Sequence, residues 1–175
     1  MTRRPAPRSA VRKAAALLHT RPDLAERILL LAEPELPARV ACVADAATVV
    51  VPLLAGHEAE RLVAVAIDRR GRVIEAAVLT VGSDTYCIVE PRQVLRWALT
   101  RRRGAAGLII AHNHPAGDPT PSGDDEVVTR RMADACTVVG IPLLDHIVVS
   151  SESQWVSCAV RGMLPAGAVR AGWTE

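Results

Sequence analysis

Two histidines one residue apart, His112 and His114, are the side chains of this sequence best suited to chemistry. They close the run "GLIIAHNH", whose apolar part has the length and composition typical of a strand covered on both faces. Because side chains repeat with a period of two along a strand, both imidazoles can point to the same side. Two neutral imidazoles that converge at a strand end suit Zn²⁺, which binds histidine nitrogen at about 2.0–2.1 Å. The pair therefore predicts a zinc site that needs at least one more ligand.

Candidates for the third ligand follow the histidines in the sequence: Asp118, Asp124 and Asp125. Ser122 has the position of a helix N-cap, and Asp125 would then be the third residue of the helix. Ser-x-x-Asp is a weaker relative of the capping box, so these two residues also have a purely structural explanation. A His-x-His pair at a strand end, followed after a seven-residue loop by serine and aspartate at a helix start, favours metal binding over capping alone.

The elements that must position these residues alternate between strands and helices with short connections. This pattern predicts the α/β class, with a mixed β-sheet flanked by helices and a short N-terminal helical segment. We expect a hairpin over 60–82 around the turn "DRRGR". Further strands are expected at 85–89, 106–112, 141–150 and 154–160. Helices are expected at 9–19, 22–32, 43–55, 91–103 (ended by Gly104) and 122–139.

The sequence predicts three regions, which are a basic arm with short helices over 1–42, one α/β domain over 43–162 and a mobile tail over 163–175. The arm carries five arginines and one lysine before its first acidic residue, Asp23. A solvated arm is a better interpretation of this pattern than an organelle transit peptide. Arginines in the arm offer contacts to nucleic-acid phosphates.

Composition narrows the class of protein. The chain has 175 residues, is 50% hydrophobic and carries a formal net charge of +2, which indicates one ordinary domain and no charge-driven partner. Its four cysteines are scattered without a C-x-x-C pair, which argues against a zinc ribbon or a disulfide framework. No apolar run reaches the ~18 residues that a membrane span needs. We therefore expect a cytoplasmic protein with no membrane partner.

The spacing His112-x-His114, seven residues, Ser122, two residues, Asp125 matches the JAMM (MPN+) metalloprotease motif, H-x-H-x7-S-x2-D. More closely, "AHNHPAGDPTPSGDD" followed by "GIPLLDHIVVS" resembles the bacterial RadC family of JAMM-domain proteins. The resemblance extends from about residue 43 to residue 162 and includes "VEPRQVLRWAL" and the hairpin "AIDRRGRVI". It implies the layered JAMM/MPN fold, which is related to that of the zinc deaminases.

The resemblance also implies roles for individual residues. His112, His114 and Asp125 would hold Zn²⁺, with a water as the fourth ligand and nucleophile. Ser122 would donate a hydrogen bond to the oxyanion of the tetrahedral intermediate. A glutamate upstream would act as general base, which the position at the start of the first hairpin strand assigns to Glu60. Glu58 has the same parity and is the alternative.

Two further residues belong to the family pattern or lie near it. His146, in "LLDHIVV", is either a hydrogen-bonded core residue packed with Asp145 or an outer support of the metal site. Arg92 is either solvated or ion-paired, or else a contact for an anion or a substrate carboxylate.

The sequence departs from typical RadC proteins at two places. Those proteins carry a helix-hairpin-helix with a Gly-x-Gly turn that contacts DNA, whereas residues 1–42 contain no glycine. Ala116 stands where serine is usual, at a position that is not a proposed ligand.

Three functions follow from the pattern and its resemblance. The leading prediction is a zinc metallohydrolase that cleaves peptide or isopeptide bonds in a peptide or a modifier-conjugated protein. The alternatives are a factor or nuclease associated with DNA repair, and a metal-binding interaction module without turnover.

Overall fold

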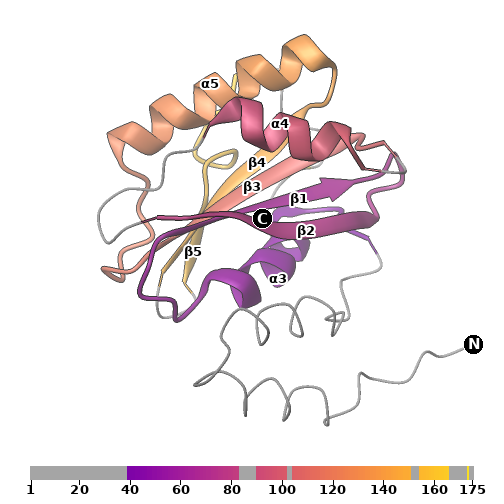
Figure 1. Ribbon diagram of the computed structural model, residues 1–175. Helices are drawn as coiled ribbons and strands as arrows, with labels where there is room; N and C mark the ends of the chain where they lie inside the picture. The colour runs from indigo at the N-terminus through magenta and orange to yellow at the C-terminus, as the bar shows by residue number, and fades with distance from the viewer. Residues whose placement is uncertain (1–38, 83–89, 102–103, 151–153, 166–172, 174–175) are drawn as a thin grey trace, which may run out of the picture. The chain divides into compact units, whose positions relative to one another are not determined.

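The computed structural model describes residues 39–82, 90–101, 104–150, 154–165 and 173. These residues form a layered α/β domain in which helices cover both faces of one sheet (Figure 1). The helices are α3 (Val43–Leu54), α4 (Pro91–Leu99) and α5 (Gly123–Val139). The strands are β1 (Arg61–Ile67), β2 (Val73–Val81), β3 (Gly107–His114), β4 (Leu143–Ser150) and β5 (Trp155–Ser157). The predicted α/β class with a mixed sheet is confirmed.

The sheet has the strand order β2-β1-β3-β4-β5. Three of its four pairings are antiparallel, and only β3 and β4 run parallel. Parallel neighbours need a crossover connection, and α5 supplies it between β3 and β4. Helix α3 packs on one face of the sheet against β1, β3 and β4, while α4 and α5 lie on the other face (Figure 1).

Aliphatic side chains build the core, as the scarcity of aromatic residues requires. Residues 62–67 of β1 and 108–111 of β3 are all buried, because both faces of the central strands are covered by helices. One close approach fixes the beginning of β3: a Cβ on Gly107 would lie 2.9 Å from the Leu144 side chain and 3.1 Å from that of Ile67. A larger residue at this position would require these two side chains to shift.

The crossover also brings the end of β3 to the beginning of α5. Strand β3 ends at His114, the loop 115–121 follows, and Ser122 caps the helix that returns over the sheet. Ligand sites in open α/β sheets lie outside the carboxyl ends of the strands. The fold therefore places the histidine pair and the first turn of α5 side by side at such an end.

The structure corrects three expectations about the elements. Helix α4 ends at Leu99 rather than at 103, since the Thr100 hydroxyl donates to the carbonyl of Trp97 and competes with the helix. The last strand stops at Ser157, after which the chain turns. Within the predicted mobile tail, Leu164 and Trp173 are buried, so mobility is wrong for these two residues.

Several predictions lie outside the described residues. They are the basic arm and the two helices within 1–38, the strand at 85–89, and nucleic-acid contact through the arm. Among the described residues, no helix is long and apolar enough to cross a membrane. The cytoplasmic localisation stays a prediction.

Candidate metal centre

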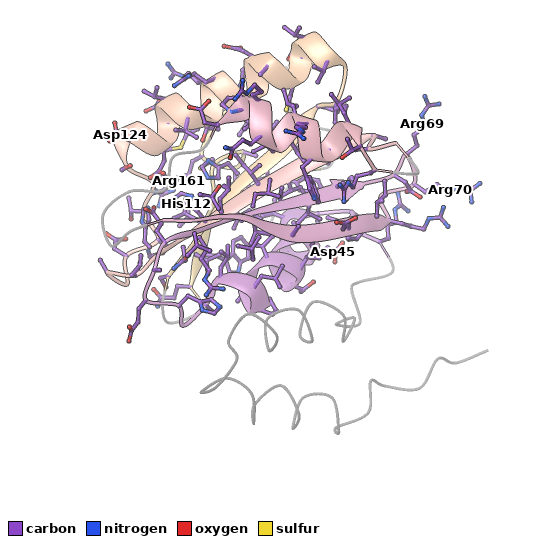
Figure 2. The ribbon with its side chains drawn as sticks, in the orientation of Figure 1. Asp45, Arg69, Arg70, His112, Asp124 and Arg161 are labelled. Atoms are coloured by element: carbon purple, nitrogen blue, oxygen red, sulfur yellow. The ribbon has the colours of Figure 1, made fainter. Side chains whose placement is uncertain are left out.

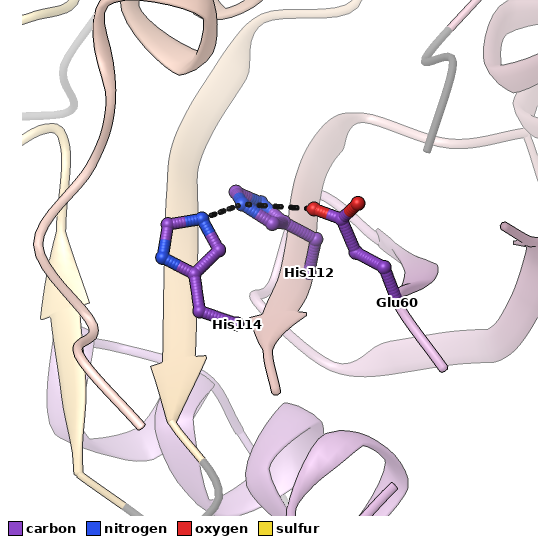
Figure 3. Close-up of side chains that lie close together, drawn as sticks. All are labelled: Glu60, His112 and His114. Carbon is purple, nitrogen blue, oxygen red and sulfur yellow. Dashed lines mark hydrogen bonds and ion pairs between the residues drawn. The ribbon is translucent and has the colours of Figure 1, made fainter. Parts of the chain in front are cut away.

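The two histidines of β3 face each other at the end of the strand. His112 is buried, and its Nε2 atom lies 3.0 Å from Nε2 of His114 (Figure 3). The rings meet nearly edge to face, with an interplanar angle of 64°. The period-two expectation that both imidazoles share one side of the sheet is therefore met by the geometry.

Asp125, in the first turn of α5, adds a carboxylate to the pair. Its Oδ1 atom lies 3.1 Å from His112 Nε2, and its Oδ2 atom lies 3.5 Å from His114 Nε2. Oδ2 also accepts hydrogen bonds from the backbone N–H and the hydroxyl of Ser122, at 2.7 and 2.6 Å. The carboxylate thus caps the helix and also faces the histidines, while its role as a metal ligand stays a prediction.

Glu60 approaches from the other side of the pair, just before β1 begins. Its Oε1 atom lies 4.0 Å from His112 Nε2 (Figure 3), and its side chain is 19% exposed. Leu62 pairs with His112 in the sheet, so Glu60, two residues earlier, shares the face of the histidines. The alternative general base, Glu58, is exposed.

These donors fit a zinc ion in number and chemistry. Glu60, His112 and His114 form a group that could hold a metal, with one ligand atom of each within 4.8 Å of the others. Two ligands of a tetrahedral zinc with bonds of about 2.0–2.1 Å are about 3.3 Å apart. The spacing between the His112 and His114 nitrogens and that from His112 to Asp125 are close to this value, whereas Glu60 stands farther from His112. The distances favour Asp125 as the third direct ligand, with Glu60 beside the site.

Charge and hydrogen bonds hold the cluster together. Burial opposes the ionised form of Asp125, but the adjacent His112, His114 and Ser122 outweigh it and keep its pKa well below the ordinary value. The hydrogen bond with Asp125 raises the pKa of His114, while partial burial opposes the rise. An anionic carboxylate that attracts cationic partners is a suitable environment for a divalent metal.

Each histidine also has an outer partner. Nδ1 of His114 lies 2.9 Å from the backbone oxygen of Asp118, and a carbonyl only accepts, so this nitrogen carries the hydrogen. Nδ1 of His112 lies 2.8 Å from Nε2 of His146, which is fully buried. Of the two interpretations of His146, the structure favours the one that connects it to the site. Its backbone N–H, not its ring, contacts Asp145.

Asn113, between the two histidines, has a function that sequence reasoning missed. It points to the opposite face of the strand and is 2% exposed. Its side-chain amide donates to the carbonyls of His57 and Ala59, and its oxygen accepts from the N–H of Arg61. The backbone groups in these three bonds belong to residues on either side of Glu60 in the sequence. Asn113 therefore fixes the backbone that carries the proposed base. A polar residue inside a strand expected to be covered on both faces could have pointed to it.

The remaining predicted residues lie around this centre or away from it. Asp118 contributes its backbone carbonyl to His114, while its carboxylate accepts from the N–H of Thr120. Asp124 is exposed at the start of α5 (Figure 2). Arg92 is exposed on α4, and no described contact brings it to the histidines. Of the three candidate aspartates, only Asp125 has a carboxylate oxygen in contact with the pair.

Comparison with known proteins places the domain in context. A family model described as "RadC-like JAB domain" matches residues 40–163. A UPF0758 protein of Listeria monocytogenes is 39% identical over 80% of this chain and 61% of its own length. UPF0758 proteins of Symbiobacterium thermophilum and a Geobacillus species are 39% and 40% identical over 65% and 59% of the chain. The matches cover 47% and 44% of those two proteins, so the chain spans about half the length of such relatives.

Proposed function

The chain belongs to the family of RadC-like JAB domains, and on that premise we propose that it is a zinc-dependent hydrolase of amide bonds. The substrate is a peptide, or a protein joined to a modifier through an isopeptide bond. Peptidase activity, the identity of the ion and the substrate are all part of this proposal.

One observation carries the proposal: three elements bring a histidine pair and two carboxylates to one point at the end of β3. The two Nε2 atoms are 3.0 Å apart, Asp125 is 3.1 Å from the first, and Glu60 is 4.0 Å from it. The inward-facing histidine nitrogens and the carboxylate oxygens lie close enough together to bind one shared cation.

The chemistry divides between the ion and the chain. Zinc held by His112, His114 and Asp125 would lower the pKa of a water towards about 7 and polarise a carbonyl. Glu60 lies beside the site, and its side chain is 19% exposed. Its carboxylate would take the proton from the attacking water and return it to the leaving nitrogen.

Ser122 would stabilise the oxyanion that forms during the attack. It is exposed at the helix start, beside Asp125. Its hydroxyl hydrogen now points to Asp125 Oδ2, and Asp125 N–H donates to the same hydroxyl at 3.2 Å. To assist the reaction, the hydroxyl would rotate from Asp125 to the substrate, a change of one side-chain torsion.

Exposure supports a macromolecular substrate. The side chains of His114, Asp125 and Glu60 are 21%, 15% and 19% exposed, so the centre opens to the surface rather than into an enclosed cavity. A bond in an extended peptide or at the end of a modifier can reach such a centre directly.

The test compares zinc-loaded wild type with Glu60→Gln and Glu58→Gln on quenched-fluorescence peptides and isopeptide-linked conjugates. Loss of a general base costs about 10²–10⁴ in rate. We expect wild-type turnover that a chelator abolishes, loss of that order in Glu60→Gln with zinc retained, and near-wild-type turnover in Glu58→Gln. Equal rates for wild type and Glu60→Gln would remove Glu60 from the mechanism. Zinc-loaded wild type that cleaves nothing would favour a non-catalytic metal-binding module.

A further inference from the structure

We propose that Thr129 and His146 are positioning residues that fix the tautomer of His112, so that its Nε2 atom presents a lone pair to the metal. The inference rests on the proposed metal centre and assigns two residues that the JAMM motif does not contain. It follows from counting the hydrogens available along a row of three contacts that begins at a backbone carbonyl.

The row begins at the backbone carbonyl of Asp125, and its first side chain is Thr129, one helical turn later. Its Oγ1 atom lies 2.6 Å from the backbone oxygen of Asp125 and 2.6 Å from Nδ1 of His146. The hydroxyl owns one hydrogen, and the carbonyl owns none. At 2.6 Å the carbonyl accepts the hydroxyl hydrogen, which leaves the hydroxyl oxygen to accept from His146. Nδ1 of His146 carries a hydrogen for this reason.

His146 transmits this choice to the metal ligand. The ring is fully buried, and burial disfavours a charged imidazolium, so the ring holds a single hydrogen. With that hydrogen on Nδ1, the Nε2 atom of His146 is an acceptor. It lies 2.8 Å from Nδ1 of His112, which must then be the donor.

The end of the row is the metal-facing nitrogen. With its hydrogen on Nδ1, neutral His112 has a bare Nε2, and this atom faces His114 Nε2 at 3.0 Å and Asp125 Oδ1 at 3.1 Å. In His114 the same tautomer, with hydrogen on Nδ1, is fixed directly by the backbone carbonyl of Asp118, which lies 2.9 Å from Nδ1. His112 is buried too deeply for a loop carbonyl and uses two side chains instead. Asp125 thus contributes twice. Its carboxylate faces the metal site, and its backbone carbonyl sets the tautomer of His112 through Thr129 and His146.

Removing the hydroxyl of Thr129 releases this constraint. His146 Nδ1 then loses its acceptor, and the opposite tautomer, with hydrogen on Nε2, would donate to His112 Nδ1. The hydrogen of His112 would move to Nε2 and block the metal-facing lone pair. Loss of such outer partners typically lowers metal affinity about 10–100-fold.

The experiment measures zinc affinity by competition with a chromophoric chelator for wild type, Thr129→Val, Thr129→Ser and His114→Ala. Thr129→Val keeps the shape of the side chain without the hydroxyl, and Thr129→Ser keeps the hydroxyl. We expect affinity about 10–100-fold weaker for the valine variant, and within about threefold of wild type for the serine variant. Urea unfolding of the metal-free proteins separates this effect from a loss of stability.

Unchanged zinc affinity in a folded Thr129→Val variant would overturn this inference alone and leave the metal centre standing. Wild type that binds zinc no better than His114→Ala would overturn the proposed function and this inference with it. Should the valine variant not fold, the ring ¹⁵N spectrum of zinc-loaded wild type decides. Hydrogen on Nδ1 of His146 supports the row, and hydrogen on Nε2 contradicts it.

Discussion

Asp145 and His146 are neighbours on β4, and each anchors a buried polar cluster on its own side of the sheet. Asp145 is fully buried, and its two oxygens accept four hydrogen bonds, from the N–H groups of His146 and Ala159, the Ser157 hydroxyl and the Trp173 indole. Burial raises the pKa of this carboxyl, and the four donors oppose the rise. Every acceptor position is used by the chain itself.

The cluster of His146 is built differently. Its row of hydrogen bonds leads outward to His112 and ends at nitrogens that face a second histidine and a carboxylate. Side chains 15–21% exposed line that end, whereas the Asp145 cluster is closed. The closed Asp145 cluster holds the fold together, whereas the other cluster brings histidine nitrogens and a carboxylate together at a partly exposed end, as a metal site requires.

The largest effect is expected for Asp145→Ala. The substitution leaves four donors without an acceptor, all of them on buried residues, and should lower the free energy of unfolding by about 3–5 kcal/mol. Urea denaturation of the metal-free protein measures this. His114→Ala, treated in the same way, should change it by about 1 kcal/mol or less, since the residue is partly exposed. An equal fall in the free energy of unfolding for the two variants would contradict the division into a structural cluster and a binding cluster.

Asn113→Ala should have an intermediate effect that touches both properties. It removes three hydrogen bonds to the backbone around Glu60, worth about 1 kcal/mol each. We expect a lower free energy of unfolding by about 2–3 kcal/mol and a reduced kcat, with zinc content unchanged because His112 and His114 remain. Loss of zinc together with activity would mean that Asn113 supports the histidines rather than Glu60.

The smallest effect is expected for Trp173→Phe. The variant keeps an aromatic ring but loses the indole N–H that donates to Asp145 at 3.1 Å. Unfolding free energy should fall by about 1 kcal/mol. Zinc affinity should stay at the wild-type value, because Trp173 belongs to the closed cluster only. A fall in zinc affinity would show that the two clusters are coupled through β4.

Local pattern predicted much of this structure. The His-x-His pair at the end of β3 follows from the period of a strand, and the start of α5 at Ser122 follows from its capping residues. The family resemblance placed the base at the start of the first hairpin strand and so favoured Glu60 over Glu58, which has the same parity, and Glu60 does lie beside the pair. Its catalytic role, like those of Ser122 and the metal ligands, stays a prediction.

Contacts between distant parts of the chain could not be predicted in this way. Asn113 bonds to backbone 52 to 56 residues away, and Trp173 reaches Asp145 across 28 residues. The early end of β5 has the same origin. Ser157 donates to Asp145, and its hydroxyl and carbonyl oxygens accept from Val160 and Arg161, which turns the chain away from the sheet. Such effects depend on the assembled core rather than on residue type and spacing.

Zinc content per chain, measured on purified wild type beside Glu60→Gln and His114→Ala, decides whether the histidine pair binds a metal. We expect near one zinc per chain in wild type and in Glu60→Gln, and near none in His114→Ala. A folded wild type that takes up no zinc when it is supplied would show that the histidine pair is a structural cluster like that of Asp145.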